Sequence, residues 1–118
     1  MDLQNEIESK LKDLDISVKQ LRITGSKYAE SYTNYRIALA QELLKLKEQC
    51  MPVTLCYDVA RGKQDIAKLK FNEIKDEAIY LANRESINAI KLEIKILAEQ
   101  IKKEYSLSEE DNLWQMIL

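Results

Sequence analysis

QCMPVTLCYDVARGKQD, residues 49–65, holds the chain's only proline, both of its cysteines and one of its two glycines. A proline disfavours helical backbone at the residue before it, so a helix arriving from the N-terminal side is predicted to end near Gln49. Helix-breaking residues are otherwise scarce in the 118 residues, and long helices are therefore expected on both sides of this stretch. Because the connection is short, the two helices are predicted to lie antiparallel.

Apolar residues on both sides of the bend recur at alternating intervals of four and three, the heptad spacing of helices that pack side by side. In the first run this row comprises Ile7, Leu11, Leu14, Val18, Leu21, Gly25, Tyr28, Tyr32, Tyr35 and Leu39. In the second it comprises Leu55, Val59, Gly62, Ile66 and Leu69, then, after a shift of phase, Phe71, Ile74, Ala78 and Leu81, and finally Ile87, Ile90, Ile94, Leu97 and Ile101. Thr54 is the expected N-cap of the second helix.

The sequence therefore predicts an all-α fold, a long antiparallel helical hairpin with coiled-coil packing over residues 1–105. Its parts are a helix over about 2–49, a bend at 50–53 and a helix over about 54–105. An acidic and apolar C-terminal tail follows at 106–118. A hairpin of this length buries one stripe per helix, so a homodimer forming a four-helix bundle is expected. The alternative, if both helices break near Gly25 and Ser86, is a compact monomeric four-helix bundle.

Charge is balanced over most of the chain, which carries 18 basic and 20 acidic residues in total. The tail contributes Glu109, Glu110 and Asp111 and no basic residue. The mixed body lacks the strong basic footprint typical of nucleic-acid binders. No apolar run approaches the ~20 residues needed to cross a bilayer, and the N-terminus does not resemble a signal peptide. Two cysteines without a secretion signal indicate a reducing cytoplasm.

Catalytic signatures are missing from the sequence. There is no histidine, which removes most general acid–base, triad and zinc arrangements. A glycine-rich phosphate loop and a paired-cysteine metal motif are also absent. We therefore expect no enzyme activity, no catalytic residue, no metal and no cofactor. Cys50 and Cys56 flank the bend and are interpreted as reduced thiols rather than as a redox staple.

The bend is more elaborate than a turn requires, and its residues are the candidate partner-binding tip: Pro52, Val53, Thr54, Asp58, Arg61 and Lys63. A helix N-terminus presents free N–H groups that favour anions, and Arg61 lies further along the same helix. The alternative is that Thr54 and Asp58 only cap the helix while Arg61 pairs with Asp58 or Asp65.

Other candidate site residues have an ordinary structural alternative. Arg61, Lys68, Lys70 and Lys75 form a possible phosphate-contacting stripe, but the balanced charge of the body favours a solvated face. Tyr28, Tyr32 and Tyr35 are a possible base-stacking row, but their place in the heptad pattern favours a buried core. Trp114, in the tail, is either a binding hot spot or a side chain that docks on its own bundle.

Three segments resemble a group of small helical proteins encoded by phages and prophages of Gram-positive bacteria: YRIALAQELLKLKEQCMPVTLCYDVARGKQDIAKL, DEAIY and ESINAIKLEIKILAEQIKKEY. The likeness covers about residues 28–105 and includes the bend. That group is often encoded among early genes for DNA replication and recombination, and no activity is established for it. The resemblance implies a cytoplasmic, non-enzymatic adaptor in the bacterial host, accessory to phage DNA replication or recombination.

Within this reading, the tip at residues 50–63 is expected to bind a protein partner of phage or host origin. One alternative is a nucleic-acid-binding accessory protein that uses the basic stripe on the second helix. Another is an inhibitor of a host defence or nuclease complex, a role to which only the acidic tail points.

Overall fold

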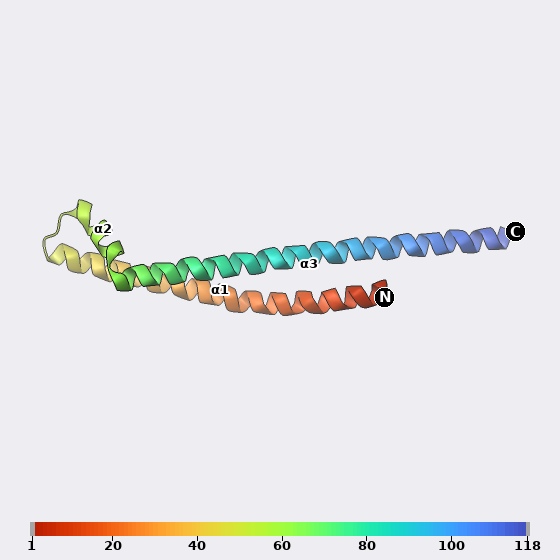
Figure 1. Cartoon of the computed structure of the whole chain (residues 1–118), viewed down its shortest axis with the longest axis horizontal. Helices are drawn as coiled ribbons and strands as arrows, with labels where there is room; N and C mark the ends of the chain where they lie inside the picture. Colours follow the sequence, from red (N-terminus) through yellow and green to blue (C-terminus); the bar gives the residue numbers. More distant parts are fainter. Residues whose placement is uncertain (1, 118) are drawn as a thin grey trace. The chain divides into compact units, whose positions relative to one another are not determined.

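The computed structural model describes the backbone of residues 2–117 and their side chains except those of 108 and 110–113. It contains three helices, α1 (Leu3–Glu48), α2 (Val53–Gly62) and α3 (Gln64–Ile117), with no strand over the described residues (Figure 1). The predicted all-α helical hairpin is confirmed. Its contacts fall into two compact units, the tip unit (residues 21–83) and the ends unit (residues 1–20 and 84–118). Among the residues described, no helix is long and apolar enough to cross a membrane.

Neither suspected break interrupts its helix. Gly25 lies within α1 and Ser86 within α3, so the alternative of a compact bundle of four short helices is wrong. Gly25 instead allows a close approach between helices. A Cβ at this position would lie 3.2 Å from Cε1 of Tyr80, which is tighter than ordinary van der Waals contact. The glycine therefore leaves room for the Tyr80 ring against the backbone of α1.

The first helix ends in a Schellman motif. The N–H of Cys50 donates to the carbonyl of Lys47 (3.0 Å), and the N–H of Met51 donates to that of Leu46 (3.2 Å). This motif needs a left-handed residue at the position after the cap, which is usually glycine. Here Cys50 fills it with φ of 62°. The chain turns here, so the predicted end of the first helix near Gln49 is confirmed.

The second half of the hairpin is divided, whereas the sequence pattern predicts one helix from about residue 54. Lys63 is extended (ψ 137°) and separates α2 from α3. Pro52 occupies the N-cap position of α2 without a side-chain capping bond, so the expected N-cap at Thr54 is wrong. The division lets α2 turn independently of α3, and Lys63 forms an ion pair with Glu42 of α1. At its other end α3 continues without interruption into residues 106–117.

A small apolar core fixes α2 against α1. Cys56 and Ala60 are fully buried beside Leu46, with Leu39, Leu43 and Met51 packed around them. The small side chains of Cys56 and Ala60 let the two helices approach closely. Both cysteines are free, as expected; the thiol of Cys56 donates to the carbonyl of Met51 at 3.6 Å, and Cys50 is exposed.

In the tip unit, α3 faces α1 with a different row of residues from the one predicted. Phe71, Ile74 and Leu81 are 64%, 56% and 45% exposed, so their expected place in the seam is wrong. The row that turns toward α1 keeps the three-four rhythm from Ile66 without a phase shift, but it is largely polar: Leu69, Glu73, Asp76, Tyr80 and Asn83. Hydrophobic periodicity selects the apolar row and therefore misses a seam built from polar side chains.

Polar side chains in this seam are paired across the two helices. The hydroxyl of Thr24 donates to the amide oxygen of Asn83 (3.0 Å), and the hydroxyl of Ser31 donates to Oδ2 of Asp76. Asp76 is almost completely buried, and its Oδ1 makes no hydrogen bond within the part of the chain that the structure describes. Tyr28 stacks on Tyr80 with ring centroids 5.9 Å apart.

In the ends unit the predicted row of α3 is followed closely, whereas Leu11 and Val18 of the predicted α1 row are exposed. Ile87 is buried, and Ile90, Ile94, Leu97 and Ile101 are half-buried, at the predicted intervals along α3. Lys10 of α1 pairs with Glu93 of α3 at 2.7 Å. The hydrogen bond that Lys10 donates to Glu93, followed by the charge of Glu93, raises the pKa of Lys10.

Replacing Cys50 by glycine is expected to stabilise the hairpin by about 0.5–1 kcal/mol, because a left-handed conformation strains any residue with a Cβ. Thermal unfolding followed by circular dichroism should show a melting temperature a few degrees higher. Cys50→Ser removes the thiol but keeps the strained backbone, so it should leave the melting temperature nearly unchanged. An equal gain from both variants would show that the thiol, not the backbone, sets stability here.

Removing the hydroxyl of Ser31 is expected to destabilise the chain, because the buried carboxylate of Asp76 then loses its only described hydrogen-bond donor. Ser31→Ala should cost about 1–3 kcal/mol of unfolding free energy in urea denaturation. The double variant Ser31→Ala/Asp76→Leu should recover most of that loss, since no unpaired charge remains buried. Thr33→Ala, which removes an exposed hydroxyl, is the control and should change stability by less than about 0.5 kcal/mol. A Ser31→Ala variant as stable as this control would contradict the prediction.

Candidate binding groove at the hairpin tip

A groove of about 380 Å³ lies between the three helices in the tip unit. We call it the tip groove. It is lined by Tyr35, Arg36, Leu39, Ala40 and Leu43 of α1, Tyr57 and Arg61 of α2, and Lys70 of α3. A neighbouring hollow shares Tyr35, Arg61 and Lys70 and adds Ala67.

The break at Lys63 creates this arrangement. It allows α2 to leave the direction of α3, so that Arg61 on α2 and Lys70 on α3 can line the same cavity. Tyr35 is only 7% exposed and forms part of the wall near α3. The groove therefore depends on all three helices.

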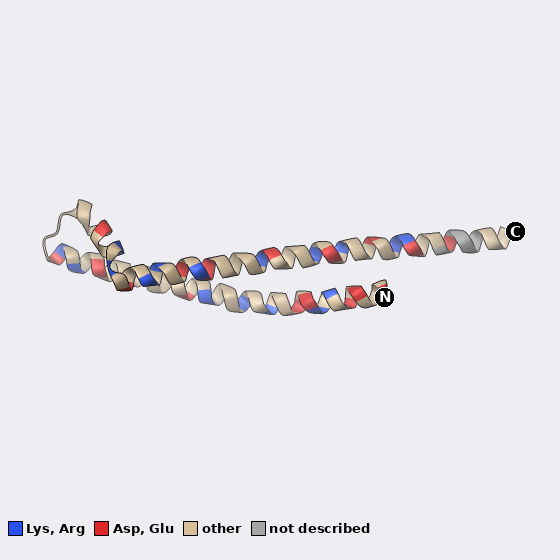
Figure 2. Cartoon of the chain, viewed as in Figure 1, with Lys and Arg blue, Asp and Glu red and all other residues tan. Residues whose placement is uncertain are grey.

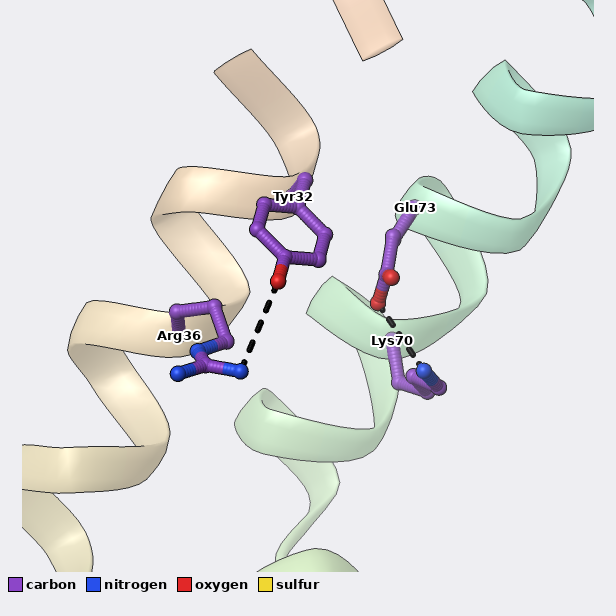
Figure 3. Close-up of polar contacts among 4 residues, drawn as sticks. All are labelled: Tyr32, Arg36, Lys70 and Glu73. Atoms are coloured by element: carbon purple, nitrogen blue, oxygen red, sulfur yellow. Dashed lines mark hydrogen bonds and ion pairs between the residues drawn. The ribbon is translucent and has the colours of Figure 1, made fainter. Parts of the chain in front are cut away.

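Each of the three cations in the groove makes a cation–π contact with a tyrosine ring. The charged group of Arg36 lies 5.7 Å from the ring centre of Tyr32, that of Arg61 lies 5.2 Å from Tyr57, and that of Lys70 lies 4.8 Å from Tyr35. Figure 3 shows Arg36 reaching back along α1 to the hydroxyl of Tyr32, from which its Nη1 is 3.4 Å away. Such cation–π contacts hold the side chains in place without neutralising their charge.

One carboxylate lies next to the groove without lining it, and it contacts Lys70. Oε2 of Glu73, a buried residue of α3, lies 3.0 Å from Nζ of Lys70 (Figure 3). The hydrogen bond that Lys70 donates to Glu73 raises the pKa of the Lys70 amine. Further along the seam, burial and then the charge of Glu77 raise the pKa of Tyr28.

The predicted tip residues lie in three different environments. Pro52, Val53, Thr54 and Asp58 are exposed on the bend and α2, whereas Arg61 lines the tip groove. Lys63 is half-buried and held by Glu42.

The predicted basic stripe is divided as well. Arg61 and Lys70 share the groove, while Lys68 and Lys75 are exposed on α3 and do not line it. The regular spacing that suggested a stripe is interrupted by the break at Lys63.

Arg36 and Tyr57 were not singled out from the sequence, although each belongs to a recognisable pattern. Tyr32 and Arg36 are four residues apart, and so are Tyr57 and Arg61. This spacing places a cation over a ring on one helix face. The convergence of the two pairs is visible only once α2 is folded against α1.

The aromatic residues singled out in the sequence differ in burial. Tyr35 is buried and Tyr28 half-buried, as expected for the core, but Tyr32 is exposed and its predicted burial is wrong. The indole of Trp114 is 63% exposed, so it does not dock within its own hairpin.

Charge elsewhere is interspersed, and Figure 2 shows acidic and basic residues mixed along α1 and α3. A groove of about 430 Å³ in the ends unit illustrates the contrast. It is lined by Lys10 and also by Glu6 and Glu93, so its cation is neutralised within the groove. Over the described residues, no group of carboxylates and thiols is placed to hold a metal ion.

No family model, curated protein or solved structure matches this chain. The site is therefore interpreted from its own geometry. It offers cations that contact tyrosine rings and an apolar wall, which suit binding of an anionic group.

Proposed function

We propose that this chain is a non-enzymatic interaction protein whose hairpin tip binds a protein partner. The observation that supports this most directly is the exposure of apolar side chains on α2. Val53, Leu55 and Val59 are substantially exposed there, although the helix is only ten residues long and already buries Cys56 and Ala60 on α1. Apolar side chains gathered on an exposed element are characteristic of surfaces that bind other proteins.

The setting comes from the sequence resemblance. An adaptor in the bacterial cytoplasm, accessory to phage DNA replication or recombination, would bind a phage or host protein through this surface. An inhibitor of a host defence or nuclease complex remains the alternative, and the acidic residues near the C-terminus support it. The lack of histidine supports a role without catalysis.

Placing a charge on α2 is expected to weaken partner binding while the hairpin stays folded. The test captures proteins from phage-infected Gram-positive cells with the wild-type chain, identifies the captured protein and titrates it directly. Leu55→Asp should weaken that affinity about tenfold or more, because an apolar contact is replaced by a desolvated charge. Leu92→Asp, the same change at an exposed leucine of α3 in the ends unit, should bind normally. Equal affinities for the two variants would reject the tip as the binding surface.

We also infer a homodimer formed through the outer stripe of α3, which we define as Ala67, Phe71, Ile74, Ala78 and Leu81. These residues recur at intervals of four and three, and all of them are exposed. An antiparallel pairing of two copies centred on Ile74 places Ala67 opposite Leu81 and Phe71 opposite Ala78. Large side chains then meet small ones around a twofold axis, as a self-complementary interface requires.

The dimer predicts that Ile74→Asp yields monomers, because two carboxylates would face each other at the twofold axis. Light scattering coupled to size-exclusion chromatography should report the mass of two chains for the wild type and of one chain for this variant. Ile79→Asp changes an exposed isoleucine outside the outer stripe and should remain dimeric. A wild-type chain that is monomeric at high micromolar concentration would overturn the inference.

A further inference from the structure

The lining of the tip groove is unusual in its charge. Three of its eight residues are cationic and none is acidic, although acidic residues outnumber basic ones in the whole chain. Glu73 behind Lys70 offsets one of these charges. Glu42, another acid of the tip unit, is engaged by Lys63. The groove thus holds an excess of about two positive charges.

These cations are positioned in advance rather than free to move. Contacts with Tyr32, Tyr57 and Tyr35 restrict Arg36, Arg61 and Lys70 respectively. A guanidinium stacked on a ring keeps the N–H groups at its edge available for an oxyanion, often in a bidentate arrangement. Binding an anion here would cost less side-chain entropy than at freely moving surface lysines.

The rest of the wall indicates what accompanies the anion. Leu39, Leu43 and the ring of Tyr57 give the groove an apolar side, and its volume of about 380 Å³ is within the range of small-ligand sites. Tyr57 is about half exposed, so the part of its ring that Arg61 does not cover can contact a planar base. A phosphate next to a nucleobase matches both the charge and the wall.

We propose that the tip groove binds the phosphate of a nucleotide, with the base against Tyr57. The ligand is either a free nucleotide or a nucleotide within single-stranded nucleic acid, since both carry this chemistry. Arg36, Arg61 and Lys70 contact the phosphate. Val53, Leu55 and Val59 are not among the residues that line the groove, so the proposed protein-binding surface can be tested separately from it.

The test titrates the full chain with two probes, a fluorescein-labelled ten-residue oligothymidylate and unlabelled thymidine monophosphate. Anisotropy is measured for the first probe and amide chemical shifts by NMR for the second. Arg36→Glu and Arg61→Glu should each weaken oligonucleotide binding at least tenfold. Lys68→Glu and Lys75→Glu make the same change of charge outside the groove and should weaken it less than threefold. Neutralising one phosphate predicts a slope of log K against log[salt] of about −0.7 for the single-stranded probe.

The two probes distinguish the sources of the ligand. Monophosphate shifts confined to the groove residues support a free nucleotide, whereas binding of the oligonucleotide alone supports single-stranded nucleic acid. Loss of binding by the control variants to the same degree would overturn the site, as would no binding of either probe at millimolar concentration. Binding of a phosphotyrosine or acidic peptide in place of both probes would also overturn it. If a groove variant fails to fold, the location of the wild-type shifts decides the question.

Discussion

The hydrogen bonds of Ser31 with Asp76 and of Thr24 with Asn83 decide how the two long helices face each other in the tip unit. A buried carboxylate or amide is costly without a partner, so these pairs admit one register and one face of α3. An apolar seam would tolerate a slip along the heptad repeat more readily. The polar pairs make this part of the hairpin less stable than an apolar seam would, but they define how the two helices align.

The face of α3 that packs on α1 determines which of its residues are exposed. Since the polar row of α3 turns toward α1, the outer stripe with Phe71 and Ile74 turns toward solvent. The same helix thus presents two periodic faces, one that closes the hairpin and one available to another helix. The inferred homodimer rests on this second face, whereas the proposed protein-binding surface rests on α2.

The tip groove follows from a different local feature, the single extended residue Lys63. Without that break, Arg61 and Lys70 would lie on one continuous helix, nine positions apart, and Tyr57 would be further away still. With it, an arginine from each of α1 and α2 and a lysine from α3 line one cavity. Cation–π contacts then hold the charges beside an apolar wall.

The sequence by itself determined that the chain is helical, that it turns back at Pro52, and that isoleucines of the ends unit face α1, because glycine and proline are scarce and apolar periodicity is strong there. Only the tertiary structure decided the seam of the tip unit, since Asp76 and Asn83 look like surface residues until Ser31 and Thr24 lie opposite them. The tertiary structure also determined which residues line the tip groove. Gly62 marks a weak point beside Lys63, but the heptad row continues through it, and contacts between residues distant in sequence bring Arg36, Arg61 and Lys70 together.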